Sequence, residues 1–116
     1  MTIRRLQAGP RMSQIVIHGG TVYLAGQVAD EPLPSVREQT RQILAKIDRL
    51  LAEAGTDKSK ILSANVWLAD IAGFAEMNEV WDAWVAPGAA PARATVEAKL
   101  ARPANLVEIM VVAAEE

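Results

Sequence analysis

The sequence predicts a single α+β domain, residues 1–116, in which two helices pack on one face of a mixed β-sheet. Two segments, 36–54 and 71–84, carry apolar residues at helical spacing. The remaining segments alternate or are rich in β-branched residues, as strands are. In order along the chain they give β-β-α-β-α-β-β, and residues 2–6 can add a short leading strand. A length of 116 residues fits one domain with one hydrophobic core.

The first two strands are expected to form a hairpin. Residues 15–17 are all β-branched, and 21–25 form a second run with strand character. Between them, 18–20 contain two glycines, which favour a tight turn. Gly26 and Gln27 follow the second strand and end it.

An amphipathic helix is predicted over residues 36–54. Ser35 followed three residues later by Glu38 is a capping-box pattern. Gly55 stands where a helix commonly ends, and charged residues fill most of the opposite face. The buried face at helical spacing consists of Val36, Thr40, Ile43, Leu44, Ile47, Leu50, Leu51 and Ala54.

Residues 61–68 alternate, which predicts a strand with two different faces. Two further strands are predicted over 93–98 and 106–114, the last one mostly apolar. In the strand 61–68, one face is expected to carry Leu62, Ala64, Val66 and Leu68, and the other Ser63, Asn65 and Trp67.

The segment 71–84 predicts a second helix, with Asp70 as its N-cap and Pro87-Gly88 after its end. Its large apolar residues recur at spacings of three and four. This is typical of a helix face packed on a sheet rather than of a ligand site. The residues are Phe74, Met77, Trp81 and Trp84.

Two charged residues stand out because they interrupt the last two predicted strands. Arg93 has small neighbours, and Glu108 lies within a run of apolar residues. A buried charge is costly unless it is paired or used, and the fork of Arg93 could hold a carboxylate. Two other interpretations remain open. Both side chains could point to solvent on an open sheet face, or they could pair with each other or with Glu97 and Lys99.

Composition and charge exclude several classes of protein. Twelve Lys and Arg against fourteen Asp and Glu give a net charge of -2, and the absence of a basic block argues against nucleic-acid binding. The chain has no cysteine, no metal-binding cluster and one histidine, His18, in a glycine-rich turn. No apolar run approaches the ~18 residues that span a bilayer, and no secretory signal is present. We therefore expect a cytoplasmic protein with no membrane partner.

An ordered set of short segments extends across nearly the whole chain. The C-terminal part holds Pro91-Ala92-Arg93-Ala94-Thr95-Val96-Glu97, then Leu100 and Val107-Glu108-Ile109. Upstream lie Gly9-Pro10, Val22-Tyr23-Leu24-Ala25-Gly26-Gln27, Gln39-Thr40 to Ala54-Gly55, and Met77-Asn78-Glu79-Val80-Trp81. In this order and spacing the segments resemble the RidA/YjgF family of imine deaminases, formerly described as endoribonuclease L-PSP.

The resemblance implies a chorismate-mutase-like fold, a mixed sheet with two helices on one face. It implies a homotrimer with clefts between subunits. The activity it implies is hydrolysis of reactive enamines and imines, such as 2-aminoacrylate and 2-iminopropanoate, to 2-keto acids and ammonia. The family's enzymes need no cofactor, so none is expected here.

The resemblance also implies a site. Arg93 matches the arginine that holds the substrate carboxylate, and Glu108 matches the acid proposed to activate water, so these two are the expected catalytic residues. Asn78 matches a polar residue near the site, and Gly26 matches the turn that lines the cleft. Three positions depart from the family pattern: a tyrosine is replaced by Arg11 or Met12, a serine by Ala25 and a cysteine by Thr95. The expected substrate-binding set is Met12, Ala25, Gly26, Asn78, Arg93 and Thr95, with no metal ligand.

Two other functions remain open. The departures at Arg11 or Met12, Ala25 and Thr95 favour a non-catalytic protein that binds a small carboxylate and regulates another process. Some members of the family carry an RNA-cleaving or translation-inhibiting label. The acidic balance of this sequence argues against that activity.

Overall fold

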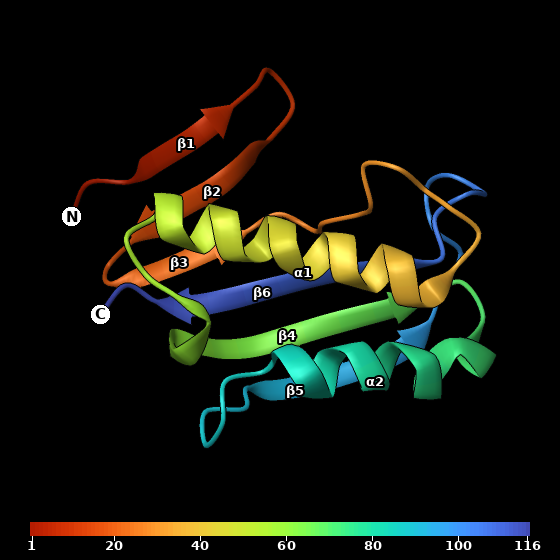
Figure 1. Cartoon of the computed structure of the whole chain (residues 1–116). Helices are drawn as coiled ribbons and strands as arrows, with labels where there is room; N and C mark the ends of the chain where they lie inside the picture. Colours follow the sequence, from red (N-terminus) through yellow and green to blue (C-terminus); the bar gives the residue numbers. More distant parts are fainter.

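A computed structural model describes all residues, 1–116, and shows one six-stranded sheet with two helices on one face (Figure 1). The predicted class and order of elements are confirmed, including the leading strand. That strand runs two residues later than predicted. The strands are β1 Arg4–Ala8, β2 Ser13–His18, β3 Thr21–Leu24, β4 Ile61–Leu68, β5 Ala92–Glu97 and β6 Val107–Ala114, and the helices are α1 Val36–Glu53 and α2 Phe74–Trp84.

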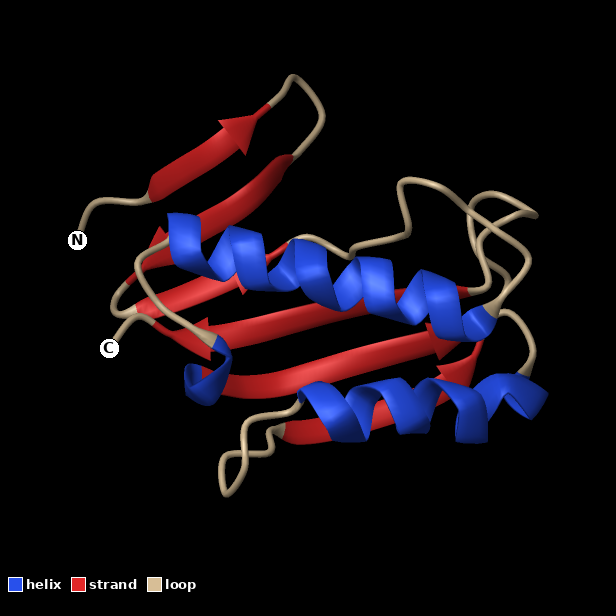
Figure 2. Cartoon of the chain, in the orientation of Figure 1, coloured by secondary structure: helices blue, strands red, loops and turns tan.

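The sheet is mixed, with the strand order β1-β2-β3-β6-β4-β5. Only β4 and β5 run parallel, and the connection between them carries α2 across the sheet. The other neighbours are antiparallel, and the last strand, β6, lies between β3 and β4. Both helices lie on the same side of the sheet in Figure 2. The smallest extent of the molecule, 20 Å, fits two such layers.

The two faces of the sheet differ in burial. On β6, Val107, Ile109, Val111 and Ala113 are buried beneath the helices, and the residues between them are half-buried. The same alternation runs through β2, β3 and β4, because successive side chains point to opposite faces. The second face carries no helix. Its partly exposed apolar residues are Val16, Tyr23, Trp67, Val96, Met110 and Val112.

The start of β4 corrects one prediction. Leu62 was expected to share a face with Ala64, Val66 and Leu68, but these three are buried and Leu62 is 53% exposed. A register shift between Ile61 and Ser63 inserts an extra residue against β6, so Ile61 takes the core position. Such a bulge changes the parity of a strand, which a simple alternation cannot anticipate.

The ends of the helices follow the sequence in part. Ser35 caps α1 as predicted, its hydroxyl accepting from the N–H of Glu38, while the Glu38 carboxylate pairs with Arg41 instead of returning to Ser35. Gly55 ends α1 with a φ of 85°. Asp70 caps the short 3-10 helix Ile71–Gly73 and not α2 itself, which begins at residue 74.

The predicted packed face of α2 is confirmed for Met77 and Trp81, which are buried. Trp84 is partly buried, and its indole N–H donates to Asp48 of α1. Phe74 is 42% exposed, so the apolar face of α2 is not fully buried at the first turn of the helix. No helix of this chain has the length and apolar character needed to cross a membrane.

Candidate functional site

Arg93 lies on the helix side of the sheet, beneath α2. Its cross-strand partner on β4 is the buried Ala64. The guanidinium carbon lies 5.0 Å from the ring centroid of Trp81 and 6.0 Å from that of Phe74. Its only side-chain hydrogen bond runs from Nη1 to the sulfur of Met77, at 3.9 Å. The first turns of α2 thus form an aromatic and thioether wall around a cation.

No acid neutralises Arg93. None of the ion pairs of the chain includes it, so the predicted alternative of a pair with Glu108 or Glu97 is wrong for a single chain. Burial lowers the pKa of the Arg93 guanidinium, and the charge of Asp82 acts in the opposite direction. Arginine remains charged under such conditions, and its other N–H donors are free to bind a planar anion.

Two polar atoms on the same side of the sheet have no partner. They are Oδ1 of Asn78 and Oγ1 of Thr95, both buried and without a hydrogen bond. Thr95 follows Arg93 by two residues on β5, so both side chains share one face. Asn78 follows Met77, the residue that touches the guanidinium. Buried polar atoms without partners are uncommon, and they mark places where a ligand or water can bind.

Glu108 lies on the opposite face of the sheet. It stands between the buried Val107 and Ile109 on β6, and its cross-strand partner is Trp67 on the helix-free face. It makes no ion pair and no side-chain hydrogen bond. The sheet therefore separates Glu108 from Arg93, so the two expected catalytic residues do not meet within one chain.

Gly26 is set directly against the Glu108 carboxylate. A Cβ at position 26 would lie 2.2 Å from Oε2 of Glu108, so only glycine leaves room for the carboxylate in this position. Two backbone hydrogen bonds hold this segment to β6. The Gln27 N–H donates to the Ile109 carbonyl at 2.8 Å, and the Ile109 N–H donates to the Gln27 carbonyl at 3.1 Å.

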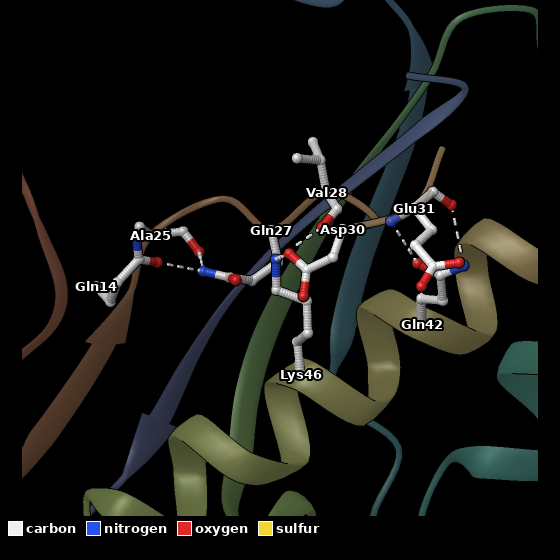
Figure 3. Close-up of polar contacts among 8 residues, drawn as sticks. All are labelled: Gln14, Ala25, Gln27, Val28, Asp30, Glu31, Gln42 and Lys46. Carbon is white, nitrogen blue, oxygen red and sulfur yellow. Dashed lines mark hydrogen bonds and ion pairs between the residues drawn. The ribbon is translucent and has the colours of Figure 1, made fainter. Parts of the chain in front are cut away.

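Helix α1 holds the loop that follows Gln27 (Figure 3). Lys46 donates to the Val28 carbonyl at 2.9 Å and to Asp30 at 2.8 Å. That hydrogen bond and the charge of Lys46 hold the pKa of the Asp30 carboxyl below its usual value. One turn away, Gln42 makes two hydrogen bonds with the backbone of Glu31.

Gln27 is the buried anchor at the start of this loop. Its side chain is 3% exposed, and its amide donates to Oε1 of Gln14 at 2.8 Å and to the Ala25 carbonyl at 3.0 Å (Figure 3). Gln14 lies on β2, so the amide connects the hairpin to the loop. In the sequence, Gln27 stands out only as the residue that ends a strand and as part of a segment that resembles the RidA/YjgF family. Its buried amide was missed because the contact joins residues that are distant along the chain.

The predicted binding residues fall into two groups. Arg93, Thr95 and Asn78 belong to the helix side, around β5 and α2. Met12 and Gly26 line one groove of about 590 Å³, and Ala25 accepts a hydrogen bond from the neighbouring Gln27. That groove contains neither Arg93 nor Glu108. No three side chains of His, Asp or Glu gather closely enough to hold a metal ion.

Comparison with known proteins supports one family. The family model described as endoribonuclease L-PSP matches residues 2–115. The chain is 48% identical to the RutC family protein YoaB of Escherichia coli K12 over 114 residues, covering 98% of this chain and 99% of YoaB. It is 47% identical to a RutC family protein of Haemophilus ducreyi over 112 residues, covering 97% and 96% of the two chains.

A solved structure agrees with the fold. The crystal structure of NMB1025, a YjgF family protein from Neisseria meningitidis, superimposes with a TM-score of 0.97 at 48% identity. The alignment covers 100% of this chain and 97% of that protein. The similarity therefore includes both the β5–α2 region and the loop beside β6.

Proposed function

Because the chain belongs to the RutC/YjgF family, whose model is described as endoribonuclease L-PSP, we propose that it is an imine and enamine deaminase. It hydrolyses intermediates such as 2-aminoacrylate to a 2-keto acid and ammonia. The observation that carries the proposal is Arg93, a half-buried cation with no acid partner beside two unpartnered polar atoms. This arrangement suits the carboxylate and the polar reacting end of a small imino acid.

The complete site is composed of two chains in a homotrimer. Since the sheet separates Arg93 from Glu108, each chain supplies two half-sites, and a neighbouring subunit closes each one. The helix-free face supports this arrangement, because its partly exposed apolar residues would be buried between subunits. Light scattering should give about three times the mass of one chain.

The reaction needs positioning, a water molecule and proton transfer. Arg93 holds the substrate carboxylate through two parallel hydrogen bonds, which fixes the imine carbon in place. Glu108 of the neighbouring subunit takes a proton from a water molecule as the water oxygen bonds to the carbon of the protonated imine, which gives a neutral carbinolamine. Glu108 passes this proton to the carbinolamine nitrogen. The C–N bond then breaks and ammonia leaves, while the hydroxyl proton goes to the Glu108 carboxylate as the C=O bond forms. Thr95 and Asn78 supply polar atoms for the reacting groups. Backbone N–H groups near Thr95 or Gly26 stabilise the charge that develops in the transition state.

The test couples the protein to a pyridoxal-phosphate dehydratase that releases 2-aminoacrylate from serine. Semicarbazide competes for the imine, and the release of 2-keto acid is followed. We expect the wild-type protein to raise the keto acid at the expense of the trapped imine, and Arg93→Ala to have no such effect. Arg41→Ala is the matched control, because Arg41 is an exposed arginine of α1 that pairs with Glu38. A folded Arg93→Ala protein with full activity would overturn the assignment.

A non-catalytic carboxylate-binding protein is the second candidate. It is favoured by Met12, Ala25 and Thr95, which replace the family's usual polar or reactive side chains. In that case a 2-keto acid binds the wild-type protein and not Arg93→Ala. Neither protein then changes how much of the imine becomes keto acid and how much is trapped by semicarbazide. Cleavage of RNA has less support, because acids outnumber Lys and Arg and no basic block is present.

A further inference from the structure

The loop between β5 and β6 surrounds a separate groove of about 550 Å³. Its walls come from residues 97–103, together with Ala69 and Asn105. It contains none of the residues assigned above to substrate or catalysis. Glu97, at its near end, is four residues beyond Arg93 on β5, which places the groove about 13 Å along the strand from the arginine.

Asn105 is the unusual residue of this groove. The residue is 5% exposed and lines the groove, and its side-chain amide makes no hydrogen bond within the chain, whereas its backbone N–H donates to the Arg102 carbonyl. Because the amide gains nothing from the protein, its free donors and acceptor are available to a molecule in the groove.

The backbone around Asn105 is held from the core. Gln39 of α1 is fully buried, and its amide donates to the Ala104 carbonyl at 3.0 Å. Its side-chain oxygen accepts from the Leu106 N–H at 2.9 Å. The peptides on both sides of Asn105 are thereby fixed, which holds the backbone from which its side chain extends into the groove. This rigidity is what a binding site requires.

The charge at the groove is positive. Lys99 and Arg102 both line it, and neither takes part in an ion pair. Glu97 is the one acid in the lining, and its Oε1 already accepts from the Ile71 N–H at 2.9 Å. The backbone N–H groups of Lys99 and Leu100 also have no partner within the chain. These groups together match an anion with several acceptor oxygens.

We propose that this groove is a second ligand site that binds a small oxyanion, the carboxylate or phosphate group of a metabolite. The Asn105 amide donates a hydrogen bond to the anion, and Lys99 and Arg102 supply the compensating charge. The site is independent of the imine chemistry and would remain if that function were absent. Its distance from Arg93 means that a small ligand here does not displace the substrate.

The test is a titration of 15N-labelled protein at constant ionic strength, with inorganic phosphate in one arm and acetate in the other. We expect saturable shifts of the Asn105 side-chain amide and the Lys99 backbone signal. The arm that binds more tightly identifies the source as phosphate or carboxylate. The double variant Lys99→Ala/Arg102→Ala should bind about tenfold more weakly or worse.

The matched control is Lys60→Ala/Arg5→Ala, which removes the same charge from two exposed positions outside the groove. Unchanged affinity in this control and weaker binding in the groove variant support the site. Asn105→Ala should weaken binding while leaving the thermal midpoint close to wild type, because no intrachain hydrogen bond is lost. The proposal is overturned if neither anion gives saturable shifts, or if the groove variant binds as tightly as the control.

Discussion

The regions around Arg93 and Glu108 are built in different ways. Around Arg93, the polar groups lack partners: the guanidinium touches a sulfur and two aromatic rings, and atoms of Asn78 and Thr95 are buried without hydrogen bonds. Around Glu108, nearly every neighbour is fixed, because Gln27 and the loop after it are bonded to β2, β6 and α1. The first region is therefore suited to bind, and the second to hold one carboxylate in place.

The largest predicted effect tests whether Arg93 of one chain and Glu108 of a neighbouring chain form one active site. Arg93→Ala and Glu108→Gln should each lower deaminase turnover by about 100-fold or more, since one removes positioning and the other removes the base. Chains of the two variants, unfolded and refolded together, should recover activity. In randomly mixed trimers about a quarter of the interfaces combine an intact Arg93 with an intact Glu108 from the next chain.

The mixture is read by the imine-partition assay, and native mass spectrometry confirms that mixed trimers form. Each variant refolded alone is the control and should stay inactive. Mixed trimers without recovered activity would show that both residues act from one chain. That result would contradict the proposal that the Arg93 region of one chain and the Glu108 region of the next chain form a shared site.

The second effect concerns the placement of Glu108. Gly26→Ala should reduce turnover by about 10- to 100-fold, because the new methyl group would displace the carboxylate from its position. Stability should change by less than about 1 kcal/mol, since the end of a flexible side chain can move aside. Gly9→Ala is the matched control: its Cβ meets nothing closer than the Met12 carbonyl at 3.5 Å, an ordinary contact. Equal loss of turnover in both variants would contradict the assigned role of Gly26.

Much of this architecture could be predicted from local patterns. Arg93 and Glu108 stand out because charges interrupt apolar strands, and Ser35 and Gly55 mark the ends of α1. The opposite orientation of the two charges could not be predicted. Alternation shows which residues of one strand share a face, but it does not relate that face to another strand.

The buried amides were also outside the reach of local patterns. Gln27 and Gln39 look like ordinary polar residues in the sequence, and each is buried because its amide bonds groups that are distant along the chain. The bulge at Leu62 has the same origin, since it depends on the register between β4 and β6. Contacts of this kind are set by the assembled fold and not by neighbouring residues.

A third prediction compares the stability of the two regions. Gln27→Leu should lower the free energy of unfolding by about 1–3 kcal/mol, because it removes the bonds to Gln14 and Ala25. Thr95→Val should leave it within about 0.5 kcal/mol, because the buried hydroxyl has no partner to lose. Urea unfolding of both variants measures the difference. A loss of stability in Thr95→Val as large as in Gln27→Leu would mean that the hydroxyl has a structural partner in solution.

The smallest effect is the pH dependence of the stability that the ion pair between Lys46 and Asp30 contributes. The pKa of Asp30 is lower in the folded chain than its ordinary value of 3.8, because Lys46 stabilises the carboxylate. A lowered folded pKa gives stability that is present above the unfolded value and is lost as the pH falls through the folded value. Asp30 is 72% exposed, so the contribution is about 0.3 kcal/mol. Wild type should therefore exceed Asp30→Asn in stability near pH 6, and the difference should vanish as the pH falls below 3.8. A difference that grows on acidification would show that the Lys46 pair does not stabilise the loop beside Glu108.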